Sequence, residues 1–365
     1  MVVPMAKPLL MLVMILKDEA ATIEKTLKSV KPFIDRWSIL DTGSTDNTKA
    51  VVRAALAGVP GELHAGSFID FATTRNKSFD LAGQAAEWIM YLDADDELQN
   101  ADGLRSFLET LPPADEAVFL NVRVPGAFFP STRIVKSSAG WKFYGVVHEV
   151  LCSPSGIIPT RTVPDAVIDH RDGPDGGART RKRWERDVDL LEDDFKKTGS
   201  HRSAFYAAMT LYWLGRYGAA VVAFTRRIAL GGFAEEVFVS TLSKARAMQG
   251  TGAPFDEVLP VFLAAHTLNP KRAEPLFDIA AWYHYLDNHP LTVLFARRAF
   301  ELEPPPNVLF LEEETYSYKA AELVAIHAWY LEHYTLGEAA ARAAYLARPE
   351  DPRFLQNLKF YIERS

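Results

Sequence analysis

The chain has 365 residues, enough for two domains, and its 48% hydrophobic content indicates globular domains rather than disorder. Its net charge of −7 offers no bulk positive charge to attract nucleic acid, so a nucleic-acid partner is not expected. The single cysteine, Cys152, cannot form an intrachain disulfide. The apolar run at residues 7–16 is too short to span a bilayer and is expected to form a buried first strand. These features predict a cytoplasmic protein without stable membrane insertion.

Strand and helix patterns alternate over residues 1–175. The predicted strands are residues 9–16, 37–40, 62–66, 88–92 and 117–124, and the predicted helices are residues 21–30, 48–56 and 73–86. This alternation predicts βαβ units and a mainly parallel sheet with helices on both faces. Ligands of such sheets bind at the carboxyl edge of the strands.

A cluster of carboxylates closes the strand at residues 88–92. Asp93-Ala94-Asp95 follows that apolar run directly, and Asp96 and Glu97 come next. Carboxylates this close repel one another unless a cation lies among them. Aspartate oxygens favour Mg²⁺ or Mn²⁺, which hold phosphates well. The cluster therefore predicts a divalent metal that bridges to a diphosphate, and a solvated acidic turn is the alternative.

Two other features belong to the same sheet edge. Residues 41–46 form a turn after the second strand, where the Asp41 carboxylate could accept the N3–H of a uracil-type base. The alternative is a simple capped strand–helix connection. Arg75 lies on the helix before the carboxylate cluster, and its guanidinium would suit a diphosphate, although a surface arginine is the simpler interpretation.

Two later residues are candidates for chemistry. Glu149, in the pair His148-Glu149, could take a proton from an acceptor hydroxyl. His170 ends an apolar run and could complete the shell of the metal with Asp95. A satisfied surface pair and a structural histidine are the alternatives.

Beyond the Gly- and Pro-rich stretch at residues 172–177, strand patterns vanish. Units with aromatic pairs and small residues recur, around Tyr212-Trp213, Trp282-Tyr283 and Trp329-Tyr330. They match loosely the Trp-x-x-Leu-Gly-x-x-Tyr pattern of tetratricopeptide (TPR) repeats, which stack helical pairs into a solenoid with a concave face. A plain helical bundle is the alternative. The predicted domains are residues 1–175 and 176–365.

Residues 1–175 resemble the GT-A glycosyltransferases of family 2. The resemblance rests on Lys17-Asp18-Glu19-Ala20 after the first strand, the turn at 41–46, residues 71–76, the segment 88–97 and residues 145–149. It implies an α/β GT-A fold, a nucleotide-diphosphate sugar donor such as a UDP-sugar, Mn²⁺ or Mg²⁺, and inversion at the anomeric carbon. The helical half resembles the TPR-like domains attached to such enzymes.

The resemblance also implies roles for single residues. It assigns the donor to Lys17, Glu19, Asp41, Arg75 and Asp93, the metal to Asp93, Asp95 and His170, and the acceptor proton to Glu149. Family members often carry Glu-Asp where this chain has His148-Glu149, so Asp165 and Asp169 compete for the role of base.

The sequence therefore predicts a metal-dependent, inverting glycosyltransferase that acts on the hydroxyl or thiol of a peptide, protein or glycan. The helical half would select the acceptor or form a homodimer. A non-enzymatic TPR-type scaffold with a degenerate nucleotide-sugar fold is one alternative. A nucleotidyltransferase is another, but it would carry a Gly-rich basic loop after the first strand, where residues 17–22 contain no glycine.

Overall fold

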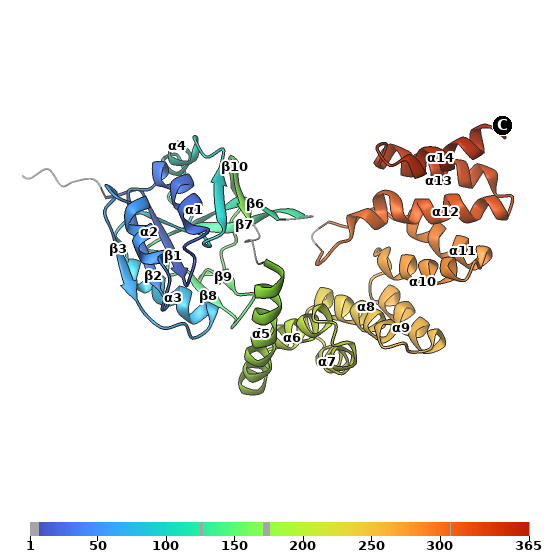
Figure 1. Ribbon diagram of the computed structural model, residues 1–365, viewed down its shortest axis with the longest axis horizontal. Coiled ribbons are helices and arrows are strands. Elements are labelled where there is room, and N and C mark those ends of the chain that lie inside the picture. The colour runs from blue at the N-terminus through green and yellow to red at the C-terminus, as the bar shows by residue number, and fades with distance from the viewer. Residues whose placement is uncertain (1–6, 125–126, 171–175, 307, 365) are drawn as a thin grey trace, which may run out of the picture. The chain divides into compact units, whose positions relative to one another are not determined.

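The computed structural model describes residues 7–124, 127–170, 176–306 and 308–364 (Figure 1). The chain divides into two compact units, Met1–Leu190 and Leu191–Ser365. Most of the predicted linker at 172–177 lies outside the described residues, and helix α5 (Gly176–Thr198) begins at its end. The boundary at residue 175 stays a prediction.

The first unit contains an eight-stranded sheet in the order β3-β2-β1-β4-β7-β6-β10-β5. Its strands are β1 (Leu10–Leu16), β2 (Arg36–Asp41), β3 (Gly61–Ala65), β4 (Trp88–Tyr91), β5 (Asp96–Gln99), β6 (Ala117–Val124), β7 (Ala127–Lys136) and β10 (Thr162–His170). β3, β2, β1 and β4 are parallel, as predicted. β7 runs antiparallel to β4 and β6, and β5 runs antiparallel to β10, so the sheet as a whole is mixed.

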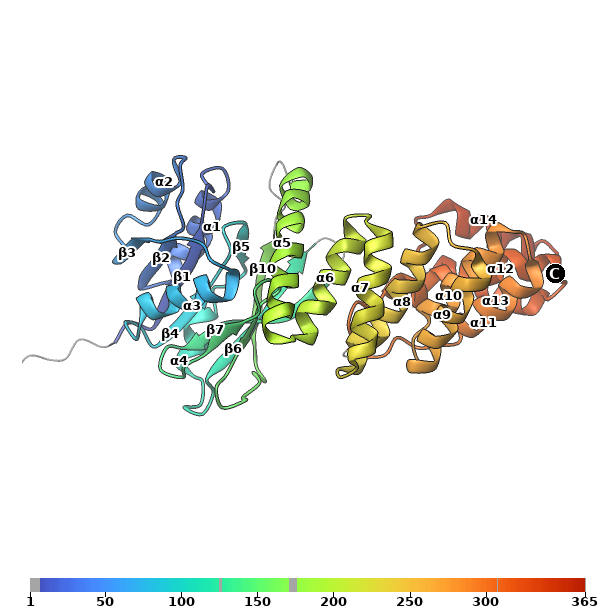
Figure 2. The same cartoon turned by 90° about the horizontal axis from the view of Figure 1, so that it is seen from below.

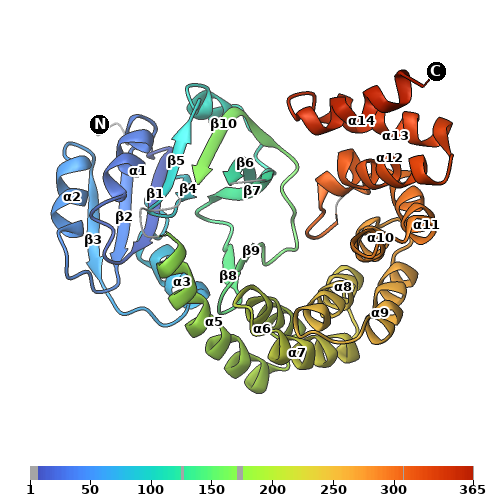
Figure 3. The same cartoon turned by 45° about the vertical axis from the view of Figure 1, so that its right-hand side comes forward.

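Alternate residues of β1 face two different cores, which explains its uninterrupted apolar sequence. Leu10, Leu12 and Met14 pack in one core with α1 (Ile23–Val30) and α2 (Thr48–Ala55). Met11 and Val13 pack on the other face with the end of α3 (Phe71–Ala82) (Figure 3). The parallel part of the sheet around β1 is thus covered on both faces, as the strand–helix alternation predicts.

Shorter elements complete the first unit. They are the 3₁₀ turn η1 (Lys31–Phe33), helix α4 (Leu104–Glu109), and a separate hairpin of β8 (Lys142–Tyr144) and β9 (Val150–Cys152). Asn76 of α3 ties this hairpin down, because its side chain donates to the Phe143 carbonyl at 2.9 Å and accepts from the Phe143 N–H at 2.8 Å. The hairpin therefore lies next to α3.

The second unit is a series of helices in antiparallel pairs (Figure 2). They are α6 (His201–Trp213), α7 (Tyr217–Leu230), α8 (Ala234–Gly250), α9 (Phe255–Leu268), α10 (Glu274–Tyr285), α11 (His289–Phe300), the π-helical turn η2 (Thr315–Lys319), α12 (Ala320–Tyr330), α13 (Tyr334–Ala347) and α14 (Pro352–Ile362). A Cβ at Gly250 would lie 2.6 Å from the Tyr217 ring, so this glycine allows α8 to approach α7 closely. The predicted TPR-like architecture is confirmed.

The aromatic residues that suggested repeats mostly pack between helices. Trp282 stacks on Phe255 with ring centroids 4.4 Å apart, and Trp329 contacts Tyr334 at 5.5 Å. Tyr330 differs, with 63% of its surface exposed. These rings therefore explain helix packing, as expected for most of them from the sequence.

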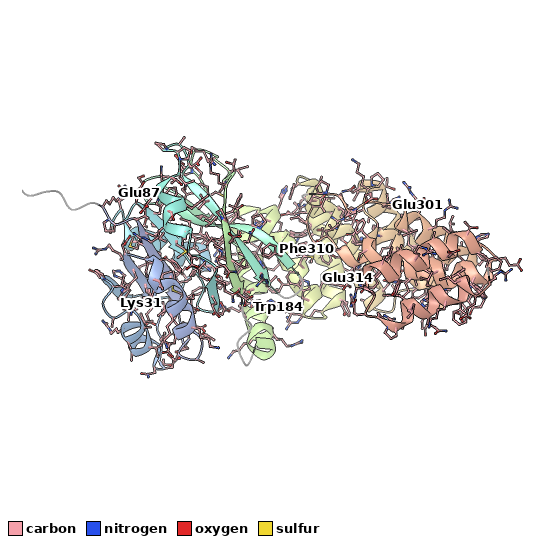
Figure 4. All side chains as sticks on the ribbon, turned by 90° about the horizontal axis from the view of Figure 1, so that it is seen from above. Lys31, Glu87, Trp184, Glu301, Phe310 and Glu314 are labelled. Carbon is pink, nitrogen blue, oxygen red and sulfur yellow. The ribbon has the colours of Figure 1, made fainter. Side chains whose placement is uncertain are left out.

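A long connection between α11 and η2 lies against α6. The buried Arg272 donates to the carbonyls of Leu309 and Phe310, at 3.0 and 3.3 Å. Phe310, labelled in Figure 4, contacts the rings of Phe205 and Trp213. This connection therefore covers part of the surface that α6 would otherwise present. Among the described residues, no helix is both long and apolar enough to cross a membrane.

Candidate functional site

Two turns at the carboxyl ends of β1 and β2 hold each other in place. Asp18, with φ +55°, accepts from the Thr45 N–H at 2.7 Å, and Asp46 accepts from the Ala20 N–H at 3.1 Å. The buried Asp41 accepts from the Ser44 N–H through both oxygens at 3.2 Å. A carboxylate has about four acceptor positions. The turn thus forms as predicted, and Asp41 keeps capacity for a further donor such as a base N–H.

Lys17 and Glu19 follow β1 at the same sheet edge. Lys17 is exposed, whereas Glu19 is half-buried. The Glu19 N–H donates to Thr48 Oγ1 at 2.8 Å, and its carboxylate accepts from Thr22 Oγ1 at 2.8 Å. Glu19 therefore fixes the start of α1 and α2, and a contact of either residue with a donor stays a prediction.

Arg75 is buried at the centre of the site, so the simpler interpretation as a surface arginine is wrong. Its Nε donates to Glu149 Oε1 at 2.6 Å, and its Nη2 donates to Asp93 Oδ1 at 2.5 Å. Burial opposes the charge of Arg75, but Asp93 and Glu149 outweigh it and raise the pKa of the guanidinium. One arginine thus joins the carboxylate cluster after β4 to the predicted base.

Asp93 carries a negative charge that two arginines stabilise. Burial raises the pKa of its carboxyl, but Arg75 and Arg133 lower that pKa far more, to well below its usual range. Arg133 Nη1 lies 3.6 Å from Asp93 Oδ2, and its guanidinium lies over the Tyr91 ring at 4.9 Å. No pattern in the sequence indicated Arg133, because its partners lie far away along the chain.

Asp96 is fully buried and holds the other side of the cluster. It accepts from the Asp93 N–H at 3.0 Å and from Arg133 Nη1 at 3.2 Å, and lies 2.9 Å from His170 Nδ1. The sequence placed Asp96 only within an acidic turn. Asp96 and Leu98 stand two residues apart, which is the spacing of one face of a strand, and both are buried. This spacing was the available signal that both belong to a strand, β5.

Asp95, Asp96 and His170 form the group whose side-chain atoms could hold a metal ion, with the ligating atoms all within 4.8 Å of one another. Two carboxylates and an imidazole suit Mn²⁺ or a related cation. Asp96 already bonds to Arg133 and to His170 Nδ1, so its role resembles that of a carboxylate that orients a ligating histidine. Asp95 and His170 therefore fit a metal, whereas Asp93 pairs with arginines.

The pKa shifts of Asp95 and His170 agree with this division of roles, in which these two residues face a metal and Asp93 pairs with arginines. Burial raises the pKa of Asp95 to about 6; Asp93 and Asp96 add to the rise and His170 opposes it. The hydrogen bond to Asp96 raises the pKa of His170 to about 9 against the effect of burial. The protonated His170 thus supplies a positive charge among these carboxylates, as a bound cation would.

The three candidate bases lie in different surroundings. Asp165 is exposed with φ +59°, and Asp169 lies 3.9 Å from Arg123 and 3.4 Å from the Gln99 amide. Arg75 bonds to both Glu149 and Asp93 and so links the two carboxylates. Glu149 has 14% of its side chain exposed. The geometry thus favours Glu149, whose assignment stays a prediction.

The fold and the site together define an α/β domain with a charged centre at the carboxyl edge of its parallel strands. Residues 11–142 match the model of glycosyl transferase family 2, so this part of the chain carries a domain of that family. Glu149, His170 and the helical unit lie beyond the matched segment.

The chain is also similar to individual proteins. The chain is 41% identical over 87 residues to a TPR repeat-containing protein of Synechococcus elongatus, covering 24% of this chain and 20% of that protein. It is 23% identical over 185 residues to the SPbeta prophage-derived glycosyltransferase SunS of Bacillus subtilis, covering 49% of this chain and 43% of SunS. The chain thus spans less than half the length of these relatives. A solved structure of S. aureus TarS 1–349 in complex with UDP aligns with a TM-score of 0.36 and 11% identity, covering 66% of this chain and 88% of that one.

Proposed function

We propose that this protein is a metal-dependent, inverting glycosyltransferase that moves a sugar from a nucleotide diphosphate, with a UDP-sugar the expected donor, to an acceptor. The observation that carries the proposal is the meeting of Asp93, Asp95, His170 and Glu149 at one sheet edge. These residues come from separate segments of the sequence. The match of residues 11–142 to the family 2 domain supports the same function.

The site can bind a nucleotide diphosphate through residues with distinct tasks. Asp41 would accept the N3–H of the base, and Asp93, held ionised by Arg75 and Arg133, would accept from the ribose hydroxyls. Asp95 and His170 would hold a divalent ion, with Asp96 orienting the imidazole. When bound, that ion would neutralise the diphosphate and act as a Lewis acid for its departure.

Glu149 is the proposed base. Arg75 binds its Oε1 and so fixes the direction of the carboxylate, with Oε2 as the oxygen to take the proton of the acceptor. General-base catalysis requires such a positioned group within hydrogen-bond reach of the nucleophile. In the inverting mechanism, the acceptor attacks from the face of the sugar opposite the leaving diphosphate.

The helical unit would supply surface rather than chemistry. Stacked helical pairs suit an extended acceptor or a second copy of the chain. We propose that this unit selects the acceptor or forms a homodimer.

A donor screen tests the proposed function. The full-length protein is incubated with UDP-, GDP- and dTDP-sugars with Mn²⁺ or with EDTA, and the release of free nucleotide is measured. The proposal predicts release from one nucleotide class that requires the metal. A protein that releases no nucleotide and binds none of these donors would instead be a scaffold.

A further inference from the structure

Residues 309–312, which we call the strap, lie on the helical unit as a bound peptide would. They are part of the connection between α11 and η2, and they are neither helical nor paired in a sheet. The strap contacts α6, α8 and α10, which are the first helices of three successive antiparallel pairs. These contacts lie within the second unit, so they do not depend on the transfer reaction proposed above.

Charged side chains of the helical unit bind the main chain of the strap. The fully buried Arg272, just before α10, donates to the carbonyls of Leu309 and Phe310 at 3.0 and 3.3 Å. Glu235 of α8 accepts from the Leu309 N–H at 3.2 Å. Every residue of a peptide has a carbonyl, and every residue except proline has an N–H. These contacts therefore recognise a main chain rather than particular side chains.

Glu312 makes a more specific contact at the other end of the strap. Its carboxylate accepts from Arg246 Nη1 of α8 at 2.5 Å, and its N–H donates to the buried Glu274 of α10 at 3.3 Å. Arg246 Nε also donates to Asp278 of α10 at 2.6 Å, which holds the guanidinium in place. The surface under the strap thus offers a positioned cation for one carboxylate of a bound peptide.

Phe310, labelled in Figure 4, anchors the strap and is also its strained residue. Its ring centroid lies 6.2 Å from that of Phe205 and 6.3 Å from that of Trp213, yet 47% of its surface is exposed. Its φ is +50°, a left-handed conformation that bulky residues rarely adopt. Such strain persists only where surrounding contacts impose it, and it is common in segments that switch between two states. The contacts of the strap thus hold it in an unfavourable backbone conformation.

The surface under the strap would keep its shape but lose hydrogen bonds if the strap moved away. Arg272 would keep its ion pair with Glu274, and Arg246 would keep its ion pair with Asp278. The N–H groups of Arg272 and the carboxylates of Glu235 and Glu274 would lose their main-chain partners. Leaving buried polar groups unpaired is costly. The main chain of another peptide would restore these hydrogen bonds.

We propose that the strap is a detachable internal ligand and that the surface beneath it binds a peptide segment of a partner protein. That peptide carries an aromatic side chain for Phe205 and Trp213 and, two positions later, a carboxylate for Arg246. Its main chain takes over the hydrogen bonds of the strap. The strap thereby controls access to this surface, because the apparent affinity for the partner falls with the fraction of protein in which the strap is closed.

A peptide with the sequence of residues 306–314, labelled with fluorescein, tests the proposal by fluorescence anisotropy with the full-length protein. Phe310→Ala/Glu312→Gln removes both side-chain contacts of the strap and should bind this peptide at least about tenfold more tightly than wild type. A peptide with the same two substitutions should bind the variant at least about tenfold more weakly than the unchanged peptide. Phe360→Ala/Glu363→Gln changes an exposed aromatic residue of α14 and the exposed carboxylate after it, and should behave as wild type.

Hydrogen exchange in the wild-type protein tests the opening of the strap without any substitution. If the strap opens while the helices stay folded, the N–H groups of Leu309 and Glu312 should exchange at least about 100-fold faster than that of the buried Ile279 inside α10. An excess of the unlabelled peptide should accelerate the exchange of both strap N–H groups further, because it holds the strap open.

Three results would overturn the inference. One is equal affinity of wild type and the folded Phe310→Ala/Glu312→Gln variant for the labelled peptide. Another is exchange of the strap N–H groups as slow as that of Ile279, which would make the strap a permanent part of the fold. The third is a wild-type dimer, measured by light scattering, that the variant does not form, since the surface would then bind the strap of a second copy. If the variant does not fold, the exchange rates decide alone.

Discussion

A chain of three histidines should make the helical unit sensitive to acid. His327 of α12 is 1% exposed; its Nε2 lies 2.6 Å from His284 Nδ1 and its Nδ1 lies 2.7 Å from His289 Nδ1. A neutral imidazole can donate to one neighbour and accept from the other, whereas an imidazolium has two donors and no acceptor. Burial, together with the neighbouring His284 and His289, lowers the pKa of His327 to about 4, and Asp287 opposes the shift.

The size of the effect follows from linkage. The pKa of His327 is lower in the folded chain than the unfolded value of about 6.5. Its neutral form therefore stabilises the fold fully above pH 6.5, and stability is lost as the pH falls from there toward 4. Between pH 7.5 and 5.5 the expected loss is about 1.3 kcal/mol. Because pH 5.5 lies above the pKa of His327 in the folded chain, this loss of stability arises mostly from protonation of His327 in the unfolded chain.

Urea unfolding followed by far-ultraviolet circular dichroism at pH 7.5 and 5.5 measures this loss. His327→Gln removes the titrating group but keeps a polar side chain, so its stability should fall by about 1 kcal/mol less than that of wild type over this interval. His64→Gln, which changes a histidine of the first unit, is the matched control and should keep the wild-type loss. Equal pH dependence in wild type and His327→Gln would refute the reasoning.

Further predictions concern the site. Asp95→Ala should abolish metal-dependent transfer without lowering Tm, because it removes a repulsive charge; surviving metal-dependent activity would contradict this role. Glu149→Gln should lower kcat by roughly 10²–10⁴-fold with little change in UDP affinity, whereas an unchanged kcat would exclude Glu149 as the base. Arg75→Ala should cost about 3–5 kcal/mol in urea unfolding, because it leaves Asp93 and Glu149 unpaired; a loss below about 1 kcal/mol would contradict the central ion-pair arrangement. A chain ending at Gly199, after α5, should, if it folds, bind UDP like the full chain but lose transfer to the natural acceptor; a folded truncation without UDP binding would place donor residues in the helical unit.

The sequence predicted the elements whose pattern is local. The apolar runs of β1, β2 and β4 and the helical spacing in α1 and α2 depend on burial of the element itself, so the periodicity alone indicates them. The same holds for the helical pairs of the second unit, whose small and aromatic residues recur with the repeat.

The missed strands depend on pairing with distant segments. β7 contains Pro130 and two polar residues, Ser131 and Thr132, and becomes a strand because β4 and β6 pair with it on both sides. β5 has four residues, of which Asp96 and Glu97 are acidic, and it forms by pairing with β10. Tertiary pairing overrides weak local propensity in both cases.

The site shows the same limit. The motifs located Asp93, Asp95, Glu149 and His170, because each follows a strand or a glycine-rich stretch. They did not show that Arg75 bonds to both Asp93 and Glu149. Glu149 lies 74 positions after Arg75 in the sequence.

The most direct test of the central claim is calorimetric titration of the full-length protein with UDP, in Mn²⁺ and in EDTA. If the sheet edge is a metal-assisted nucleotide-diphosphate site, wild type should bind one UDP per chain in Mn²⁺, and EDTA or Asp95→Ala should weaken that binding at least tenfold. Equal UDP affinity in Mn²⁺, in EDTA and in Asp95→Ala, or no UDP binding at all, would contradict the account.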